Sequence, residues 1–186
     1  MAACEGKAWL RRSIRGRFPG DEARRAESER LCRHVMDWDC YRRASAAGLY
    51  IPLAWEADVM AILRHALRSG KTVALPRVED QAHMTMRQMR SMEELVPGRW
   101  GIAEPSPEAL IVPCQELELL IVPLEGIDRR GVRLGKGGGY YDRLIAQMHG
   151  MTLGAAMSWQ WEESIPQDKW DVPLKAAADQ NGIVLF

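Results

Sequence analysis

The amino-acid sequence predicts an α/β fold, namely a three-layer α/β/α sandwich with a mostly parallel sheet and a basic N-terminal helix. Short apolar runs alternate with segments of helical periodicity along the chain. A strand–helix–strand series occupies residues 48–78. The run "LELLIVPL" at 117–124 is predominantly apolar, which is typical of a parallel strand buried on both faces. We expect one sheet with helices on both faces, in a single domain over residues 1–186.

The first half of the chain is expected to hold three helices followed by the strand–helix–strand unit. The first helix is rich in arginine and ends before Pro19-Gly20, and Asp21 is expected to be the N-cap of the second. Gly70 closes the helix of the strand–helix–strand unit. The expected ranges are 6–18, 21–36 and 40–47 for the helices, 48–53 for a strand, 56–69 for a helix and 71–78 for a strand.

The second half is expected to add strands around a glycine-rich turn. "HMTMRQM" alternates and predicts an antiparallel strand, whereas "GIAEPSPEA" is rich in turn residues. The long segment 158–180 is expected to be mostly loop. The expected ranges are 83–89, 117–124, 152–157 and 182–186 for strands and 140–150 for a helix.

Charge and composition exclude several classes of partner. Lysine and arginine together number 25, as do aspartate and glutamate, so no global basic field recruits nucleic acid or an anionic membrane. No run approaches the roughly 20 apolar residues of a membrane helix, and the N-terminus lacks the apolar region of a signal peptide. The four cysteines lack the spacing of a metal site or a disulfide framework. We expect a cytoplasmic monomer that acts on small molecules.

The segment "RLGKGGGYYDR" at 133–143 is the strongest chemical signal in the chain. Its glycines follow a buried strand and precede a helix, where backbone N–H groups and a helix N-terminus can hold phosphate. Lys136 and Arg133 can add positive charge, and Asp142 is an oxygen ligand suited to Mg²⁺. The glycines alone fit a flexible surface loop, or a tight turn with close helix–sheet packing, equally well. The segment matches neither the Walker pattern nor the dinucleotide-binding pattern.

The segment "GVRLGKGGGYYDRLI" resembles the signature of the 5-formyltetrahydrofolate cyclo-ligase family, also called 5,10-methenyltetrahydrofolate synthetases. The segments "KAWLR", "LYIPLAWEADVMAIL", "GKTVALPRV", "WGIAEPSP" and "KWDVPLKAAADQNGIVLF" are also similar to this family, so the resemblance covers nearly the full chain. It implies ATP- and Mg²⁺-dependent conversion of 5-formyltetrahydrofolate to 5,10-methenyltetrahydrofolate, with release of ADP and phosphate. The implied route phosphorylates the formyl oxygen, after which N10 attacks the formyl carbon.

The resemblance also implies roles for individual residues. The catalytic residues would be Lys136 and Arg133, and the ligands of Mg²⁺ would be Asp142 and Asp171. Substrate would contact Arg11, Ile51, Glu56, Trp100, Lys136 and Tyr140. ATP would contact Lys7, Arg11, Arg133, Leu134, Gly135, Lys136, Gly137, Gly138, Gly139, Tyr140 and Tyr141, and of the two tyrosines we expect Tyr140 to be the one that meets ligand.

Several of these residues have plainer interpretations when taken singly. Lys7 and Arg11 fit a solvated basic helix face, and Glu56 fits a carboxylate in the first turn of a helix. Trp100 fits a buried structural side chain, and Asp171 an ordinary surface acid. The chain also departs from the family at Ile127-Asp128, at "PLEG" and at Ala178-Asp179, which bears on folate fit and on the final strand.

Two other functions compete with an active cyclo-ligase. One is a non-catalytic member of the same family that binds nucleotide or folate in a regulatory role. The other is an enzyme that handles a sugar phosphate or coenzyme A on a similar sheet. An enzyme needs Arg133, Lys136, Asp142 and Asp171 together, and all four are present.

Overall fold

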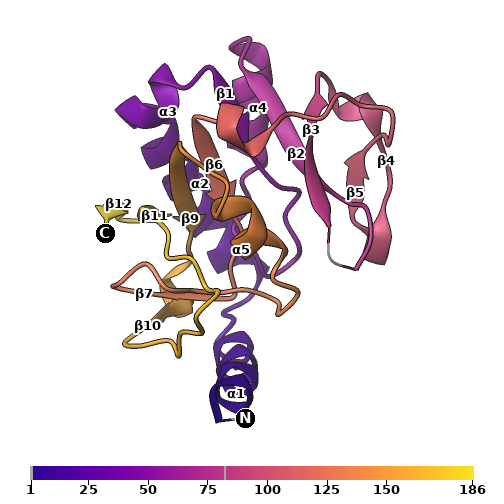
Figure 1. Cartoon of the computed structure of the whole chain (residues 1–186). Helices are drawn as coiled ribbons and strands as arrows, with labels where there is room; N and C mark the ends of the chain where they lie inside the picture. The colour runs from indigo at the N-terminus through magenta and orange to yellow at the C-terminus, as the bar shows by residue number, and fades with distance from the viewer. Residues whose placement is uncertain (1, 82) are drawn as a thin grey trace.

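A computed structural model of the chain describes residues 2–81 and 83–186, apart from the side chains of residues 2–5 and 100. Its centre is a seven-stranded sheet within these residues (Figure 1). The inner strands run parallel and both edge strands are antiparallel to their neighbours, which confirms the predicted mostly parallel sheet. The strand order is β12 (Gly182–Leu185), β11 (Ala176–Asp179), β9 (Met151–Ala155), β6 (Leu119–Val122), β1 (Ala46–Gly48), β2 (Thr72–Val78) and β3 (Met84–Met89).

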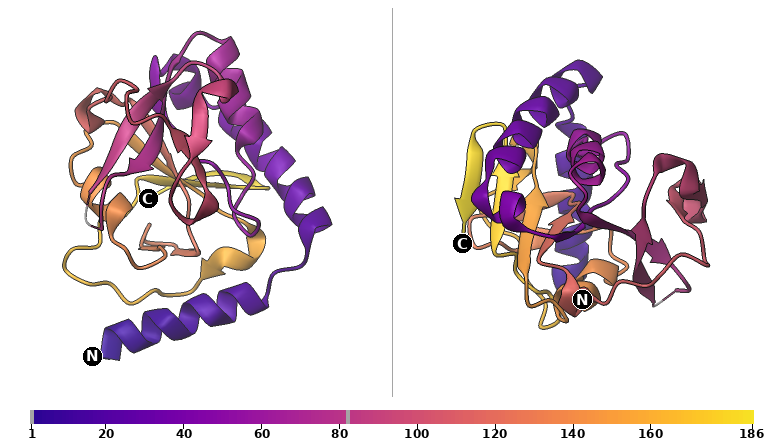
Figure 2. Two further views of the ribbon diagram at one scale, coloured as in Figure 1. Left: turned by 90° about the vertical axis from the view of Figure 1, so that its right-hand side faces the viewer. Right: turned by 90° about the horizontal axis from the view of Figure 1, so that it is seen from above.

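Successive residues of the central strands point into two different cores. Leu119 and Ile121 of β6 join the core beneath α2 (Asp21–Asp37), α3 (Asp39–Arg43) and α4 (Met60–Arg68). Leu120 and Val122 join the second core, beneath α5 (Tyr140–Ile145). The right-hand view of Figure 2 shows α2 and α4 on one face of the sheet and α5 on the other. The α/β/α layering is therefore present, although the second face is covered by one short helix together with loops.

Several helix starts differ from the prediction, and α1 (Ala2–Gly16) already begins at Ala2 where residue 6 was expected. Gly20, with φ of 103°, is the N-cap of α2, and Asp21 is its first helical residue, so the expected Asp21 cap was wrong. An acidic side chain in this first turn still complements the helix dipole. The helix predicted over 56–69 begins only at Met60, whose N–H donates to Asp58 Oδ1 at 3.0 Å. Glu56 therefore lies in a turn and not in the first turn of a helix.

The region around β1 was also predicted incorrectly. The helix expected at 40–47 ends at Arg43, and β1 covers Ala46–Gly48 where the strand was expected at 48–53. Its small residues carry little β propensity, but the sheet leaves no room for larger ones. A Cβ on Gly48 would lie 2.6 Å from Leu120 Cδ1 of the neighbouring strand.

Further strands lie where loops or turns were expected. β11 lies inside the segment 158–180, which was expected to be mostly loop. Its alanines form a strand because they are fully buried between β9 and β12, where tertiary packing overrides their helical propensity. The helix expected at 140–150 ends at Ile145. Apart from α1, the other elements of the described residues form a small sheet, a ribbon and short 3₁₀ turns. The small sheet consists of β7 (Gly126–Asp128), β8 (Arg133–Leu134) and β10 (Trp161–Glu162), and the ribbon of β4 (Leu95–Pro97) and β5 (Ala103–Pro105). The 3₁₀ turns are η1 (Met92–Glu94), η2 (Arg99–Gly101), η3 (Cys114–Glu116) and η4 (Ser158–Gln160).

The predicted N-terminal helix is present as α1 (Ala2–Gly16), which crosses the end of the molecule below the main sheet in the left-hand view of Figure 2. Leu10 and Ile14 pack against Leu134 of β8 and against Val132 and Ile165, which lie close to the three-stranded sheet. This contact fixes the basic face of α1 beside the glycine loop. Within the described residues, none of the helices combines the length and the hydropathy needed to cross a membrane.

Candidate functional site

A cavity of about 810 Å³ opens where β1 and β6 end. These strands are parallel neighbours, and the chain continues from β1 to β2 on one side while β6 lies on the other. Such a switch point at the carboxyl ends of strands is where open α/β sheets bind ligands. Tyr50 and Ile51 reach the cavity from the segment after β1, and Leu124 and Glu125 from the segment after β6.

The structure brings the residues predicted for the site together around this cavity. Trp100 is the one exception, because its side chain lies outside the described part of the chain. The predicted residues that line the cavity are Lys7, Arg11, Ile51, Glu56, Arg133, Leu134, Gly135, Lys136, Gly137, Gly138, Gly139, Tyr140, Tyr141, Asp142 and Asp171. Their convergence does not test what each of them binds.

The glycine loop is shaped by two basic side chains. Arg133 folds back beneath the loop so closely that a Cβ on Gly135 would lie 2.4 Å from its Nη1. Arg11 Nε donates to the carbonyl oxygen of Gly135 at 2.7 Å, which ties α1 to the loop. Gly137 and Gly139 have φ of 101° and 64°, a region that residues with a Cβ rarely adopt. The glycines therefore form a defined turn that presents its backbone to the cavity.

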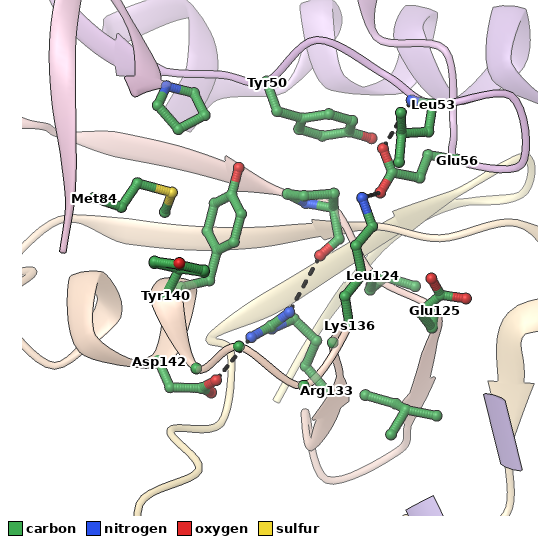
Figure 3. Close-up of a pocket in the computed structure, with 18 of the residues that line it drawn as sticks. Tyr50, Leu53, Glu56, Met84, Leu124, Glu125, Arg133, Lys136, Tyr140 and Asp142 are labelled. Atoms are coloured by element: carbon green, nitrogen blue, oxygen red, sulfur yellow. Dashed lines mark hydrogen bonds and ion pairs between the residues drawn. The ribbon is translucent and has the colours of Figure 1, made fainter. Parts of the chain in front are cut away.

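Lys136 reaches across the cavity to Glu56, as Figure 3 shows. Its Nζ lies 2.8 Å from Glu56 Oε1, and the other carboxylate oxygen accepts the N–H of Leu53 at 2.9 Å. The Glu56 side chain is only 3% exposed, whereas that of Lys136 is 44% exposed. The buried carboxylate is thus fixed in place, while the lysine that neutralises it is free to exchange partners with solvent or ligand.

Arg133, like Lys7, is a buried cation of the site. Its Nη2 lies 3.0 Å from Asp142 Oδ2, its Nη1 donates to the carbonyl oxygen of Pro123 at 3.4 Å, and its Cζ is 5.6 Å from the centre of the Tyr141 ring. Its Nε is buried without a hydrogen-bond partner. Burial raises the pKa of the Tyr141 hydroxyl, and Tyr141 also packs against the second core. Tyr140 instead donates to the carbonyl oxygen of Asp80 at 2.9 Å.

Lys7 anchors α1 to the loop that carries the predicted metal ligand. Its Nζ lies 2.7 Å from Asp168 Oδ2 and 2.5 Å from Asp171 Oδ2. Burial alone would lower the pKa of Lys7, but the two carboxylates outweigh it and the pKa is raised. Asp171 is therefore a largely buried partner of α1 rather than an ordinary surface acid.

The expected Mg²⁺ ligands fit a metal that rides on phosphates. The described residues contain no group of three or more histidine, cysteine, aspartate or glutamate side chains that would form a protein-only metal cage. Mg²⁺ commonly uses one or two carboxylates together with phosphate oxygens and water. Asp142 and Asp171 both line the cavity, and each is paired with a cation that a phosphate could draw away.

Sequence interpretation missed several polar residues of the cavity wall. Asp168 pairs with Lys7, and nothing in its local pattern distinguishes it from other loop acids. Glu104 lies on β5, within the segment expected to be a turn. Burial raises its pKa, and its Oε2 is 3.5 Å from Arg77 Nη1. Glu125 could have been noticed, because "PLEG" places an acid where the family has a small apolar stretch. It is 2% exposed and contacts Arg15 and Trp55.

Comparisons with known proteins agree with one another. The sequence profile of the 5-formyltetrahydrofolate cyclo-ligase family matches residues 5–179. The 5-formyltetrahydrofolate cyclo-ligase of Haemophilus influenzae is 28% identical over 169 residues, covering 88% of this chain and 90% of its own. The enzyme of that name from Escherichia coli K12 is 29% identical over 161 residues, covering 83% and 88%. A solved structure of 5,10-methenyltetrahydrofolate synthetase from Aquifex aeolicus superposes with a TM-score of 0.85 at 30% identity, covering 96% of this chain and 92% of its own.

Proposed function

The chain belongs to the 5-formyltetrahydrofolate cyclo-ligase family, and from this premise we propose that it closes the ring of 5-formyltetrahydrofolate with Mg-ATP as phosphoryl donor. The products would be 5,10-methenyltetrahydrofolate, ADP and phosphate. The observation that carries the proposal is that one cavity holds both a glycine loop flanked by Arg133 and Lys136 and the buried carboxylate of Glu56. The glycine loop with its two cations suits a polyphosphate, and the Glu56 carboxylate suits the N–H groups of a pterin.

The chemistry explains why both sets belong in one cavity. A formyl oxygen is a poor leaving group, so ring closure is slow until that oxygen carries a phosphoryl group. Transfer of the γ-phosphoryl group of ATP to the formyl oxygen turns that oxygen into a good leaving group and releases ADP. The N10 nitrogen then attacks the formyl carbon and loses its proton, and the C–O bond breaks as phosphate leaves. Catalysis of this kind depends on alignment and charge neutralisation rather than on a protein nucleophile.

We assign the alignment of ATP with the formyl oxygen to residues around the glycine loop. Lys136 can move from Glu56 towards the oxygen between donor and acceptor, because its side chain is half exposed. The buried guanidinium of Arg133 would neutralise charge on the transferred group. Lys7 and Arg11 would contact the remaining phosphates from α1. Asp142 and Asp171 would hold Mg²⁺, which supplies neutralisation of phosphate charge when bound.

A turnover assay tests the proposal directly. The purified chain should convert 5-formyltetrahydrofolate to a product that absorbs in the near ultraviolet only when both ATP and Mg²⁺ are present. Lys136→Ala should abolish turnover while the far-ultraviolet circular dichroism spectrum stays that of the folded wild type. The melting temperature should fall, because the buried carboxylate of Glu56 loses its cation. A near-wild-type rate in this variant would contradict the role of Lys136. Intact ATP binding without turnover in the wild type would instead favour the non-catalytic, regulatory function.

A further inference from the structure

Three residues from distant parts of the chain meet at the edge of the cavity next to Glu56. Trp55 Nε1 donates to Glu125 Oε1 at 3.2 Å. Arg15, on α1, donates to both oxygens of Glu125, at 2.9 Å from Nε and 2.6 Å from Nη2. The Arg15 guanidinium carbon also lies 4.8 Å from the centre of the Trp55 ring.

This arrangement holds the indole ring of Trp55 in one orientation. Its N–H is fixed by a carboxylate that is itself 2% exposed, and one ring face is covered by a guanidinium. The hydrogen bonds from Arg15 and Trp55 occupy both oxygens of Glu125, so this carboxylate acts through its neighbours. Trp55 lines the cavity, whereas Arg15 is not among the residues that do. The ring therefore forms a rigid aromatic wall whose uncovered surface is available to a ligand.

The position of the wall indicates which ligand it meets. Trp55 directly precedes Glu56, whose buried carboxylate can accept two N–H donors. A pterin presents two adjacent donors, the 2-amino group and N3–H, and so matches a carboxylate. Adenine places the acceptor N1 beside its amino group and does not. The groups that suit phosphate lie on the glycine loop, so the chemistry favours the pteridine as the ring system beside Glu56 and Trp55.

We propose that Trp55 stacks on the pyrimidine half of the reduced pteridine, and that Glu125 and Arg15 are positioning residues that hold it there. The inference rests on the proposed function, because it takes a 5-formylated reduced folate as the ligand. Aromatic stacking on a heterocyclic base typically contributes about tenfold or more in affinity. The acid in "PLEG", a segment that replaces the more usual small, apolar stretch of the family, thereby gains a role in substrate orientation.

Equilibrium binding of 5-formyltetrahydrofolate without ATP tests this separately from turnover. Trp55→Leu should weaken binding about tenfold, whereas Trp55→Phe, which keeps an aromatic face, should lose only about threefold. Glu125→Val removes the acceptor for the indole N–H and should approach the Trp55→Leu result. Glu125→Gln keeps a carbonyl acceptor and should retain most of the affinity. In all variants, binding of Mg-ATP should stay within about twofold of wild type.

The matched control is Trp9→Leu, because Trp9 is a 60% exposed tryptophan on α1 that does not line the cavity. It should bind folate as the wild type does. Unchanged folate affinity in Trp55→Leu, or an equal loss of Mg-ATP affinity, would overturn the inference even if the wild type turns over. A wild type that binds folate in a Trp55-dependent way but shows no turnover would refute the proposed function alone, and absence of folate binding would refute both.

Discussion

At the scale of single residues, the cavity is built from charges that neutralise one another. Lys136 pairs with Glu56, Arg133 with Asp142, and Lys7 with Asp171. Buried charges require such partners, because an unpaired ion in a low-dielectric interior is strongly destabilising. A polyphosphate can replace a carboxylate as the partner of each cation. Under the proposed function, the carboxylates would then be released towards metal or pterin, so the same pairs that stabilise the fold would serve ligand binding.

Glu104 gives a prediction about pH. Burial raises its pKa above the ordinary value of 4.5, and its contact with Arg77 only partly offsets this. Because the pKa of Glu104 is raised in the folded state, protonated Glu104 stabilises the fold below pH 4.5. This contribution is lost as the pH rises through the pKa of Glu104 in the folded state. Glu104→Gln resembles the protonated form. The free energy of unfolding of the variant should therefore increase relative to wild type as pH rises from about 4 to 7.

Urea denaturation at several pH values measures this difference. The comparison between the two proteins matters, because other carboxylates titrate in both and cancel. A stability difference that is constant over this pH range, or that favours wild type increasingly at neutral pH, would contradict the prediction. The latter result would mean that the ion pair with Arg77 outweighs the burial of the Glu104 carboxylate.

At the scale of elements, the sequence correctly predicted the helices and strands that follow from their own local residue pattern. β6 is predominantly apolar and lies within its predicted range, and α2, which follows the Pro19-Gly20 break, was found close to its predicted range. β1 and β11 were missed or displaced, because runs of alanine and glycine become strands only through the neighbours that leave no room for larger side chains. The glycine loop lies between these cases, since its pattern predicted a turn but not the arginine that folds beneath it.

Gly135→Ala tests the close contact between the loop and Arg133. The added Cβ would lie 2.4 Å from Arg133 Nη1, so the guanidinium, which also pairs with Asp142, must shift. Misplacement of a charged group by about 1 Å can cost on the order of 100-fold in rate, so we expect kcat/KM to fall by about 10- to 100-fold. Steady-state kinetics should show this loss of kcat/KM, and the far-ultraviolet circular dichroism spectrum should stay close to that of the wild type.

Gly16→Ala is the control for this substitution. Gly16 ends α1, does not have a positive φ, and an added Cβ would meet nothing within 4 Å. The variant should keep wild-type kinetics. If Gly135→Ala is equally active, Arg133 either relaxes without loss or has no part in the reaction.

At the scale of the whole molecule, the site is formed by contacts between segments far apart in sequence. Lys7 meets Asp171 across 164 residues, and Arg15 meets Glu125 across 110. Local patterns contain no information about such pairs. Resemblance to the family supplied the identity of Lys7, Glu56 and Asp171, but it could not supply Glu125 and its partners, because this chain departs from the family there. Their role becomes visible only when α1 is placed against the ends of β1 and β6.

This convergence predicts that the two substrates assist each other in binding. When a phosphate draws Lys136 away, the buried carboxylate of Glu56 loses its cation, and the N–H groups of a pterin can replace it. A non-hydrolysable Mg-ATP analogue should therefore raise the affinity for 5-formyltetrahydrofolate by about 5- to 100-fold, with the reciprocal effect of folate on the analogue.

Glu56→Gln should remove this coupling, because the amide does not need a cation. We expect about tenfold or greater loss of folate affinity, since a hydrogen bond to a charged acceptor is replaced by a neutral one. The analogue alone should bind as tightly as to wild type or more tightly, because Lys136 is no longer held. Glu29→Gln, on the exposed face of α2, is the control and should keep the full coupling. Calorimetric titrations of each ligand with and without the other measure all of these quantities. Persistence of the coupling in Glu56→Gln, or its absence in wild type, would show that Lys136 and Glu56 do not link the two halves of the cavity.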